Sequence, residues 1–190
     1  MSTYTVGYII GSLSKQSINR TLSKALIRLA PPQLAFTEIP IKDLPLYNRD
    51  YDVDYPPEGR ALKAAITAVD AVLFVTPEHN RSIPGALKNA IDWASRPWGD
   101  NSFTLKPSAV IGASPGKIGT AIAQLSLRSV LGYCNSPQMT SPEAYIQFHP
   151  DVFTADGDVL DDSTKQFLTG FMADFATFIG RVHSVIPQLR

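Results

Sequence analysis

The segment GSLSKQSINR gathers small polar side chains that could bind an anion. Ser12, Ser14, Ser17 and Asn19 supply hydroxyl and amide donors, and Lys15 adds a positive charge. The apolar run YTVGYII precedes the segment and helical periodicity follows it, which predicts a turn from a strand into a helix. The first N–H groups of a helix lack intrahelical partners, and the helix dipole favours negative charge there. The segment therefore predicts a site for one terminal phosphate.

Two familiar nucleotide-binding patterns are absent from this segment. It lacks the G-x-x-x-x-G-K-[ST] of a P-loop and the G-x-G-x-x-G of a pyrophosphate-binding turn. A triphosphate or a tightly held dinucleotide is therefore disfavoured. The alternative is a capped turn rich in Ser and Asn that binds no ligand.

A second polar segment, TPEHNRSIPG, follows the apolar run AVLFVT and leads into a helical pattern entered by Pro84, with Ser82 as the expected cap. Its row of donors and acceptors suits the edge of a planar heterocycle. These groups belong to Glu78, His79, Asn80, Arg81 and Ser82. His79 could act as a base, but a lone histidine without an orienting carboxylate more often serves as a hydrogen-bonding or surface residue. We therefore predict no catalytic side chain here.

A third segment, GASPG at 112–116, matches the G-x-S-x-G nucleophile elbow of hydrolases. A hydrolase would need an acid and a histidine later in the chain. The candidates are Asp151, Asp158, His149 and His183. Pro115 directly follows the serine and lacks the N–H that an elbow contributes to its oxyanion hole. We therefore interpret Ser114 as a ligand-contacting hydroxyl on a Gly-rich turn, with a serine hydrolase as the weaker alternative.

The elements that must position these segments alternate along the chain. Apolar runs predict strands over 4–10, 34–41, 71–76, 108–113 and 144–148, and periodicity predicts helices over 17–29, 58–68, 84–95, 118–132 and 162–183. This alternation indicates an α/β fold, a flavodoxin-like doubly wound five-stranded parallel sheet of order 2-1-3-4-5 with helices on both faces. In such a sheet the ligand lies beyond the carboxyl ends of the strands. The three polar segments should therefore meet at one edge.

Composition narrows the class of partner. The 190 residues suit a single domain over 1–190, and 17 basic residues balance 17 acidic ones, which disfavours binding to nucleic acid or to an anionic membrane. No signal peptide or membrane span is recognisable, so a cytoplasmic location is expected. One cysteine and three scattered histidines give no metal-binding spacing, so no metal site is expected.

Two of these segments carry a resemblance to a known family. GSLSKQSINR is similar to the G-S-x-R-x-x-S-x-N phosphate loop of the NADPH-dependent FMN reductases, which belong to the flavodoxin-like superfamily. TPEHNRSIPGALKNAIDWASRP resembles the T-P-E-Y-N-x-S-x-P-G-x-L-K-N-A-I-D-W segment of the same family. The resemblance covers most of the chain and is closest to the bacterial quinone and chromate reductase branch.

The resemblance implies a role for each polar segment. The FMN phosphate would be held by Ser12, Ser14, Lys15, Ser17 and Asn19. The isoalloxazine ring would be bordered by Pro77, Glu78, His79, Asn80, Arg81 and Ser82. Ser114 and Gly116 would approach the ring from the side of the fourth strand.

Three positions depart from the family pattern. Ser14 stands where the family usually has arginine, which shifts phosphate binding toward Lys15 and backbone donors. His79 replaces the usual tyrosine, and Arg81 adds a cation that could draw an anionic substrate or the phosphate of NADPH.

The resemblance also implies an activity. NADPH or NADH would reduce bound FMN by hydride transfer, and the flavin would pass two electrons to a quinone, azo dye, nitro compound, chromate or free flavin. The chemistry belongs to the flavin, so no catalytic side chain is required. The rivals are a flavodoxin-like electron carrier and a non-catalytic FMN-binding module. A homodimer or homotetramer is implied. Arg128 and Glu143 could form an inter-subunit pair, or instead an intrachain or solvated pair.

Overall fold

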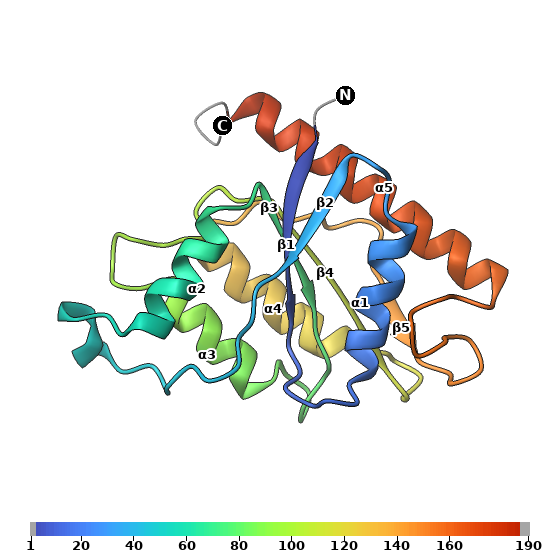
Figure 1. The fold of residues 1–190 in the computed structure, drawn as a ribbon, viewed down its shortest axis with the longest axis horizontal. Coiled ribbons are helices and arrows are strands. Elements are labelled where there is room, and N and C mark those ends of the chain that lie inside the picture. Colours follow the sequence, from blue (N-terminus) through green and yellow to red (C-terminus); the bar gives the residue numbers. More distant parts are fainter. Residues whose placement is uncertain (1–2, 187–190) are drawn as a thin grey trace.

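The computed structural model describes residues 3–186 and contains one five-stranded parallel sheet. The strands are β1 (Tyr4–Ile10), β2 (Leu34–Glu38), β3 (Ala71–Val75), β4 (Ser108–Ser114) and β5 (Tyr145–Gln147). Their order is β2-β1-β3-β4-β5, and every neighbouring pair is parallel. The flavodoxin-like order predicted from the sequence is therefore confirmed. All strands point their carboxyl ends toward the lower edge in Figure 1.

The helices cover both faces of this sheet. They are α1 (Ile18–Leu29), α2 (Pro57–Thr67), α3 (Gly85–Ala94), α4 (Ala121–Tyr133) and α5 (Asp162–Val185), with a short 3-10 helix, η1, at Arg49–Val53. Figure 1 shows α1 and α5 to one side of the sheet and α2 and α3 to the other. Every residue of β3 is buried; Leu73 and Val75 face the α1–α5 core, whereas Val72 and Phe74 face the opposite core.

The last helix packs by an apolar stripe. Its buried residues include Leu168, Phe171, Met172, Phe175, Ile179 and Val182. Phe167 lies at the margin of this stripe and is 39% exposed. Within residues 3–186, no helix is both long enough and apolar enough to cross a bilayer.

Most element boundaries lie within two residues of the predicted ones, but the end of the second strand and the start of the fourth helix differ by three. The second strand ends at Glu38 instead of 41, although Ile39 and Ile41 remain buried after it. The fourth helix begins at Ala121 instead of 118, because Gly119 has a φ of +57°, which lies outside the right-handed helical region.

A close approach between β3 and β4 fixes the floor of the site. A Cβ atom at Gly112 would lie 2.0 Å from the carbonyl oxygen of Thr76, so no larger residue fits without moving the backbone. Here glycine is required by contact, and the loops that follow β3 and β4 therefore start side by side.

Candidate active site

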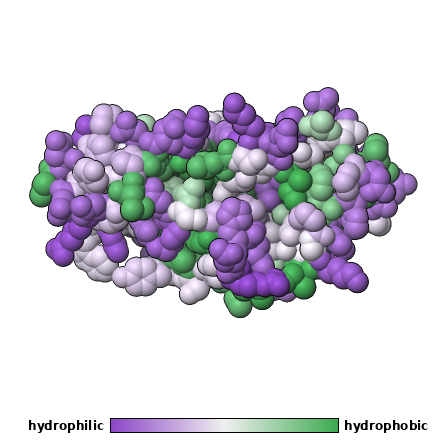
Figure 2. Space-filling model, turned by 90° about the horizontal axis from the view of Figure 1, so that it is seen from below, coloured by the Kyte–Doolittle hydropathy of each residue, from purple (hydrophilic) through white to green (hydrophobic). Residues whose placement is uncertain are grey.

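The three predicted segments leave the sheet at one edge. Gly11 N–H donates to the carbonyl of Val75 over 2.9 Å, and Thr76 N–H donates to that of Ile111 over 2.9 Å. These bonds place the ends of β1, β3 and β4 next to one another. Figure 2 looks onto this edge, where apolar surface shows between polar side chains. The convergence expected from the sheet order is therefore present.

The phosphate loop, residues 11–17, leaves its donors largely unused. Its side chains make only local contacts: Ser12 Oγ accepts from Ser14 N–H, and Ser14 Oγ accepts from Gln16 N–H, both over 3.3 Å. Ser17 stands at the N-cap position of α1, is 8% exposed and forms no side-chain cap bond.

The backbone at the start of α1 is equally available. Among the described residues, the N–H groups of Ser17, Ile18 and Asn19 have no hydrogen-bond partner. Unpaired N–H groups at the positive end of a helix, with hydroxyls beside them, fit a phosphate group. The residues present therefore suit the phosphate of FMN.

Asn19 makes a different contact from the one the resemblance suggested. It is 1% exposed; its Nδ2 donates to the carbonyl of Ala113 and its Oδ1 accepts from Ala113 N–H, each over 2.9 Å. The side chain thus joins the start of α1 to the end of β4. Its backbone N–H remains one of the unpaired N–H groups at the start of α1.

The ring-side turn, residues 79–82, is a tight hairpin turn. His79 and Ser82 exchange two backbone hydrogen bonds of 3.0 and 2.9 Å, while Asn80 and Arg81 have φ values of +50° and +63°. Two central residues in the left-handed region define a type I′ turn. All four side chains are exposed at the candidate site.

The expected helix cap at Ser82 is wrong. The helix α3 begins at Gly85 with Pro84 at the N-cap position, and no side chain caps it. Ser82 is unavailable for capping because its backbone closes the hairpin turn with His79.

Glu78 precedes the ring-side turn, and its side chain points back into the protein. Its carboxylate side chain is 9% exposed. Oε2 accepts from the N–H groups of Ile122 and Ala123, each over 3.1 Å, and Oε1 accepts from Arg81 Nη1 over 2.9 Å. The carboxylate therefore caps α4 and holds Arg81.

The third segment forms a turn without catalytic partners for its serine. Ser114 Oγ accepts from Gly116 N–H over 3.2 Å. His183 is 2% exposed, stacks on Tyr4 and contacts the carbonyl of Asp70, at the opposite edge of the sheet. No histidine within residues 3–186 hydrogen-bonds to Ser114, so the G-x-S-x-G pattern does not form a hydrolase triad here.

A bidentate ion pair next to the phosphate loop was missed by the sequence reasoning. Arg20 donates to both carboxylate oxygens of Glu38 over 2.9 and 3.0 Å, and Tyr8 Oη donates to Glu38 over 3.3 Å. Burial raises the pKa of Tyr8, and Glu38 raises it further. Arg20 and Glu38 line a small pocket of about 80 Å³ together with Ser12. No spacing in the sequence marks this pair, because its partners come from different elements.

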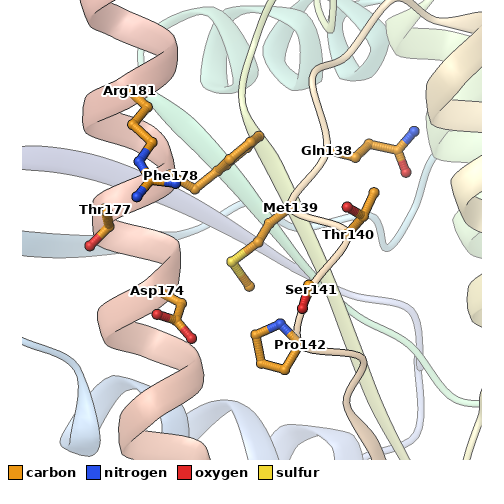
Figure 3. Close-up of a pocket in the computed structure, with 9 residues that line it drawn as sticks. All are labelled: Gln138, Met139, Thr140, Ser141, Pro142, Asp174, Thr177, Phe178 and Arg181. Atoms are coloured by element: carbon orange, nitrogen blue, oxygen red, sulfur yellow. The ribbon is translucent and has the colours of Figure 1, made fainter.

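A larger cavity lies elsewhere. It measures about 460 Å³ and runs between the second half of α5 and residues 138–142 (Figure 3). Phe178 points from α5 toward Met139, and Asp174 faces Pro142. None of the predicted site residues lines it.

This fold, with unpaired N–H groups at the start of α1 and two further polar loops at the same edge of the sheet, defines a flavodoxin-like α/β protein. The chain belongs to the NADPH-dependent FMN reductase family, whose model matches residues 4–151. It is therefore an enzyme, an FMN-dependent NAD(P)H oxidoreductase.

Individual relatives are similar over nearly their whole length. A 2-hydroxy-1,4-benzoquinone reductase of Burkholderia sp is 45% identical over 174 residues, 92% of this chain and 95% of that protein. A quinone reductase of Pseudomonas putida is 46% identical over 177 residues, 93% of this chain and 95% of that protein.

The solved structures agree with this family. The flavoenzyme NAD(P)H:(acceptor) oxidoreductase FerB from Paracoccus denitrificans is 49% identical, with a TM-score of 0.91 over 94% of this chain and 98% of that one. A flavodoxin from Pseudomonas aeruginosa shares only the fold, at 16% identity and a TM-score of 0.56. The enzyme prediction is confirmed over the electron-carrier alternative.

Proposed function

We propose that this enzyme passes two electrons from NADPH or NADH, by way of FMN at the three converging loops, to quinones. The observation that carries the proposal is the phosphate loop with its unpaired N–H groups, adjoining two polar loops at the same edge of the sheet. The names of the relatives, a 2-hydroxy-1,4-benzoquinone reductase and quinone reductases, support the acceptor class.

The site residues act by binding and orienting. Bound FMN supplies the hydride acceptance and the electron transfer. The phosphate is held by Ser12, Ser14, Lys15, Ser17 and the backbone N–H groups that begin α1. The ring is bordered by Pro77, His79, Asn80, Arg81, Ser82, Ser114 and Gly116. We assign no side chain as an acid, base or nucleophile.

The test separates binding from turnover. Purified protein is mixed with FMN and desalted, and its visible flavin absorbance is recorded before and after anaerobic addition of NADPH. Retained absorbance that NADPH bleaches, and that 1,4-benzoquinone restores, is expected. Absence of FMN binding at any concentration, with no oxidation of NADPH or NADH in the presence of the quinone, contradicts the proposal.

Azo dyes, nitro compounds, chromate and free flavin belong to the same proposal as alternative acceptors. All can take electrons from a reduced flavin in an open pocket. Steady-state kcat/KM values for each acceptor, at a fixed NADPH concentration, rank them directly. We expect quinones to give the highest value.

We further propose a homodimer or homotetramer that uses α4 and its neighbouring loops. Large apolar side chains are exposed there: Ile118, Ile122, Leu125 and Tyr133 are 46%, 40%, 67% and 73% exposed. Arg128 Nη1 donates to the carbonyl of Met139 in the same chain over 2.9 Å. Light scattering at micromolar concentration tests the assembly, and a monomer contradicts it. A cytoplasmic location remains a prediction.

A further inference from the structure

We infer that Glu78 is a positioning residue that holds the ring-side turn against the start of α4; this inference rests on the proposed FMN site. The resemblance placed Glu78 at the edge of the flavin ring. Its carboxylate instead uses both oxygens within the protein. Its effect on the reaction therefore acts through the groups it holds.

The contacts join two of the three site loops. Glu78 follows β3, whereas its partners Ile122 and Ala123 lie in the first turn of α4, which follows β4. The hairpin turn closes on itself through His79 and Ser82. Those two backbone bonds fix the shape of the turn, but they do not fix where it sits relative to the sheet. The bonds from Glu78 supply that placement.

The helix needs this cap because its own N-cap residue supplies none. Thr120 forms no side-chain cap bond with α4, and its Oγ1 accepts from Gln124 Nε2 over 2.9 Å. A carboxylate at a helix start pairs with unpaired N–H groups and with the positive end of the dipole. Glu78 thus caps α4 from another loop, 44 residues earlier in the chain.

The same carboxylate orients Arg81. Arg81 is 67% exposed by side chain, and its backbone has a φ of +63°, a conformation uncommon for a residue with a Cβ. The ion pair with Glu78 holds its guanidinium at the site edge. Loss of the Glu78 side chain would therefore have three effects at once. Arg81 would lose its ion-pair partner, two N–H groups of α4 would lose their acceptor, and the ring-side turn would lose its connection to α4.

A matched control exists in the same chain. Asp161 caps α5: its Oδ2 accepts from Thr164 N–H and from Ser163 Oγ, each over 2.7 Å. It stands after β5, outside the three site loops. Glu78 and Asp161 are therefore both carboxylate helix caps, of which only Glu78 also holds a loop of the proposed site.

The experiment compares Glu78→Ala, Glu78→Gln and Asp161→Ala with the unmodified enzyme. Apo-protein melting temperature reports the lost cap, whereas visible circular dichroism of bound FMN and the rate of flavin reduction by NADPH report the ring environment. We expect both alanine variants to melt at lower temperature. Only Glu78→Ala should change the flavin dichroism and slow reduction, by about 10- to 100-fold, because small misplacements of reacting groups have effects of that size.

The glutamine variant keeps the test decisive. Glu78→Gln would retain an acceptor for α4 but lose the charge that holds Arg81, so a smaller slowing than in Glu78→Ala is expected. If Glu78→Ala does not fold, the reduction rate of Glu78→Gln is compared with those of the unmodified enzyme and of Asp161→Ala instead. Flavin dichroism and reduction rate equal to those of the unmodified enzyme, in every Glu78 variant that folds, overturn the inference. Failure of the unmodified enzyme to bind FMN overturns the proposed function instead.

Discussion

The phosphate loop and the ring-side turn use their polar groups in opposite ways. The phosphate loop makes only two weak local contacts, and the N–H groups at the start of α1 have no partner among the described residues. The ring-side turn closes on itself and is tied to α4 through Glu78. Under the proposed function, the loop assigned to the phosphate keeps its donors for the ligand, whereas the turn assigned to the ring edge uses its contacts to fix its own position.

The largest expected effect comes from the close approach between β3 and β4, at the base of the ring-side turn. Gly112→Ala places a methyl group about 2 Å from the carbonyl oxygen of Thr76. The backbone must shift, and we expect a loss of about 3 kcal/mol or more in unfolding free energy, at the upper end for overpacking. Urea unfolding of the apo-protein measures it.

The matched control for that variant is Gly116→Ala. A Cβ there would meet only Ser114 Oγ, at 3.5 Å, which is an ordinary contact. Its unfolding free energy should stay close to that of the unmodified protein. Equal losses in the two variants would contradict the role assigned to the approach between β3 and β4.

Asn19→Ala should come next in size. It leaves the buried N–H and carbonyl of Ala113 without their partner, and such groups cost about 1–3 kcal/mol when unsatisfied. Thermal or urea unfolding of the apo-protein should show this loss before any FMN is added. Unchanged apo stability, with weaker FMN binding alone, would return Asn19 to the role of a phosphate ligand.

Ser17→Ala should give the reverse pattern. Its hydroxyl forms no cap bond, so apo stability should hardly change. Loss of one donor to a charged phosphate should weaken FMN binding by about 1.5–3 kcal/mol, measured by quenching of flavin fluorescence. If Ser17→Ala lowered apo stability as much as Asn19→Ala does, the Ser17 hydroxyl would have a structural role instead of a ligand-binding one.

The smallest expected effect concerns Asp161, which caps α5 away from the site, and this effect depends on pH. Donation from Ser163 and Thr164 lowers the pKa of Asp161 from 3.8 to about 2. A lowered folded-state pKa means that the contribution is present above the unfolded pKa and is lost as pH falls toward 2. The stability difference between the unmodified protein and Asp161→Asn should therefore be larger near pH 5 than near pH 2. A difference independent of pH contradicts the cap.

Much of this arrangement could be predicted from local sequence. The alternation of apolar runs and periodic helices indicated the sheet order, since each strand and helix carries its own pattern. The candidate phosphate residues followed from a strand-to-helix turn rich in hydroxyls. The start of α4 was predicted three residues too early, because Gly119 adopts a left-handed conformation that the pattern does not reveal.

The hydrogen bonds that join the loops of the site to other elements could not be predicted in this way. Asn19 bonds to Ala113, 94 residues away, and Glu78 bonds to Ile122, 44 residues away. In the sequence both side chains resemble exposed ligand-binding groups, because polar residues in loops and at helix starts usually face solvent. Only the packed sheet brings their partners within reach.

The comparison of FMN with riboflavin tests the central claim most directly. The two molecules share the ring and the ribityl chain, and only FMN carries the phosphate. Titration of the apo-protein with each should show much tighter binding of FMN, with Ser17→Ala reducing that advantage. Equal affinity for FMN and riboflavin in the unmodified protein would show that residues 11–17 do not bind the phosphate.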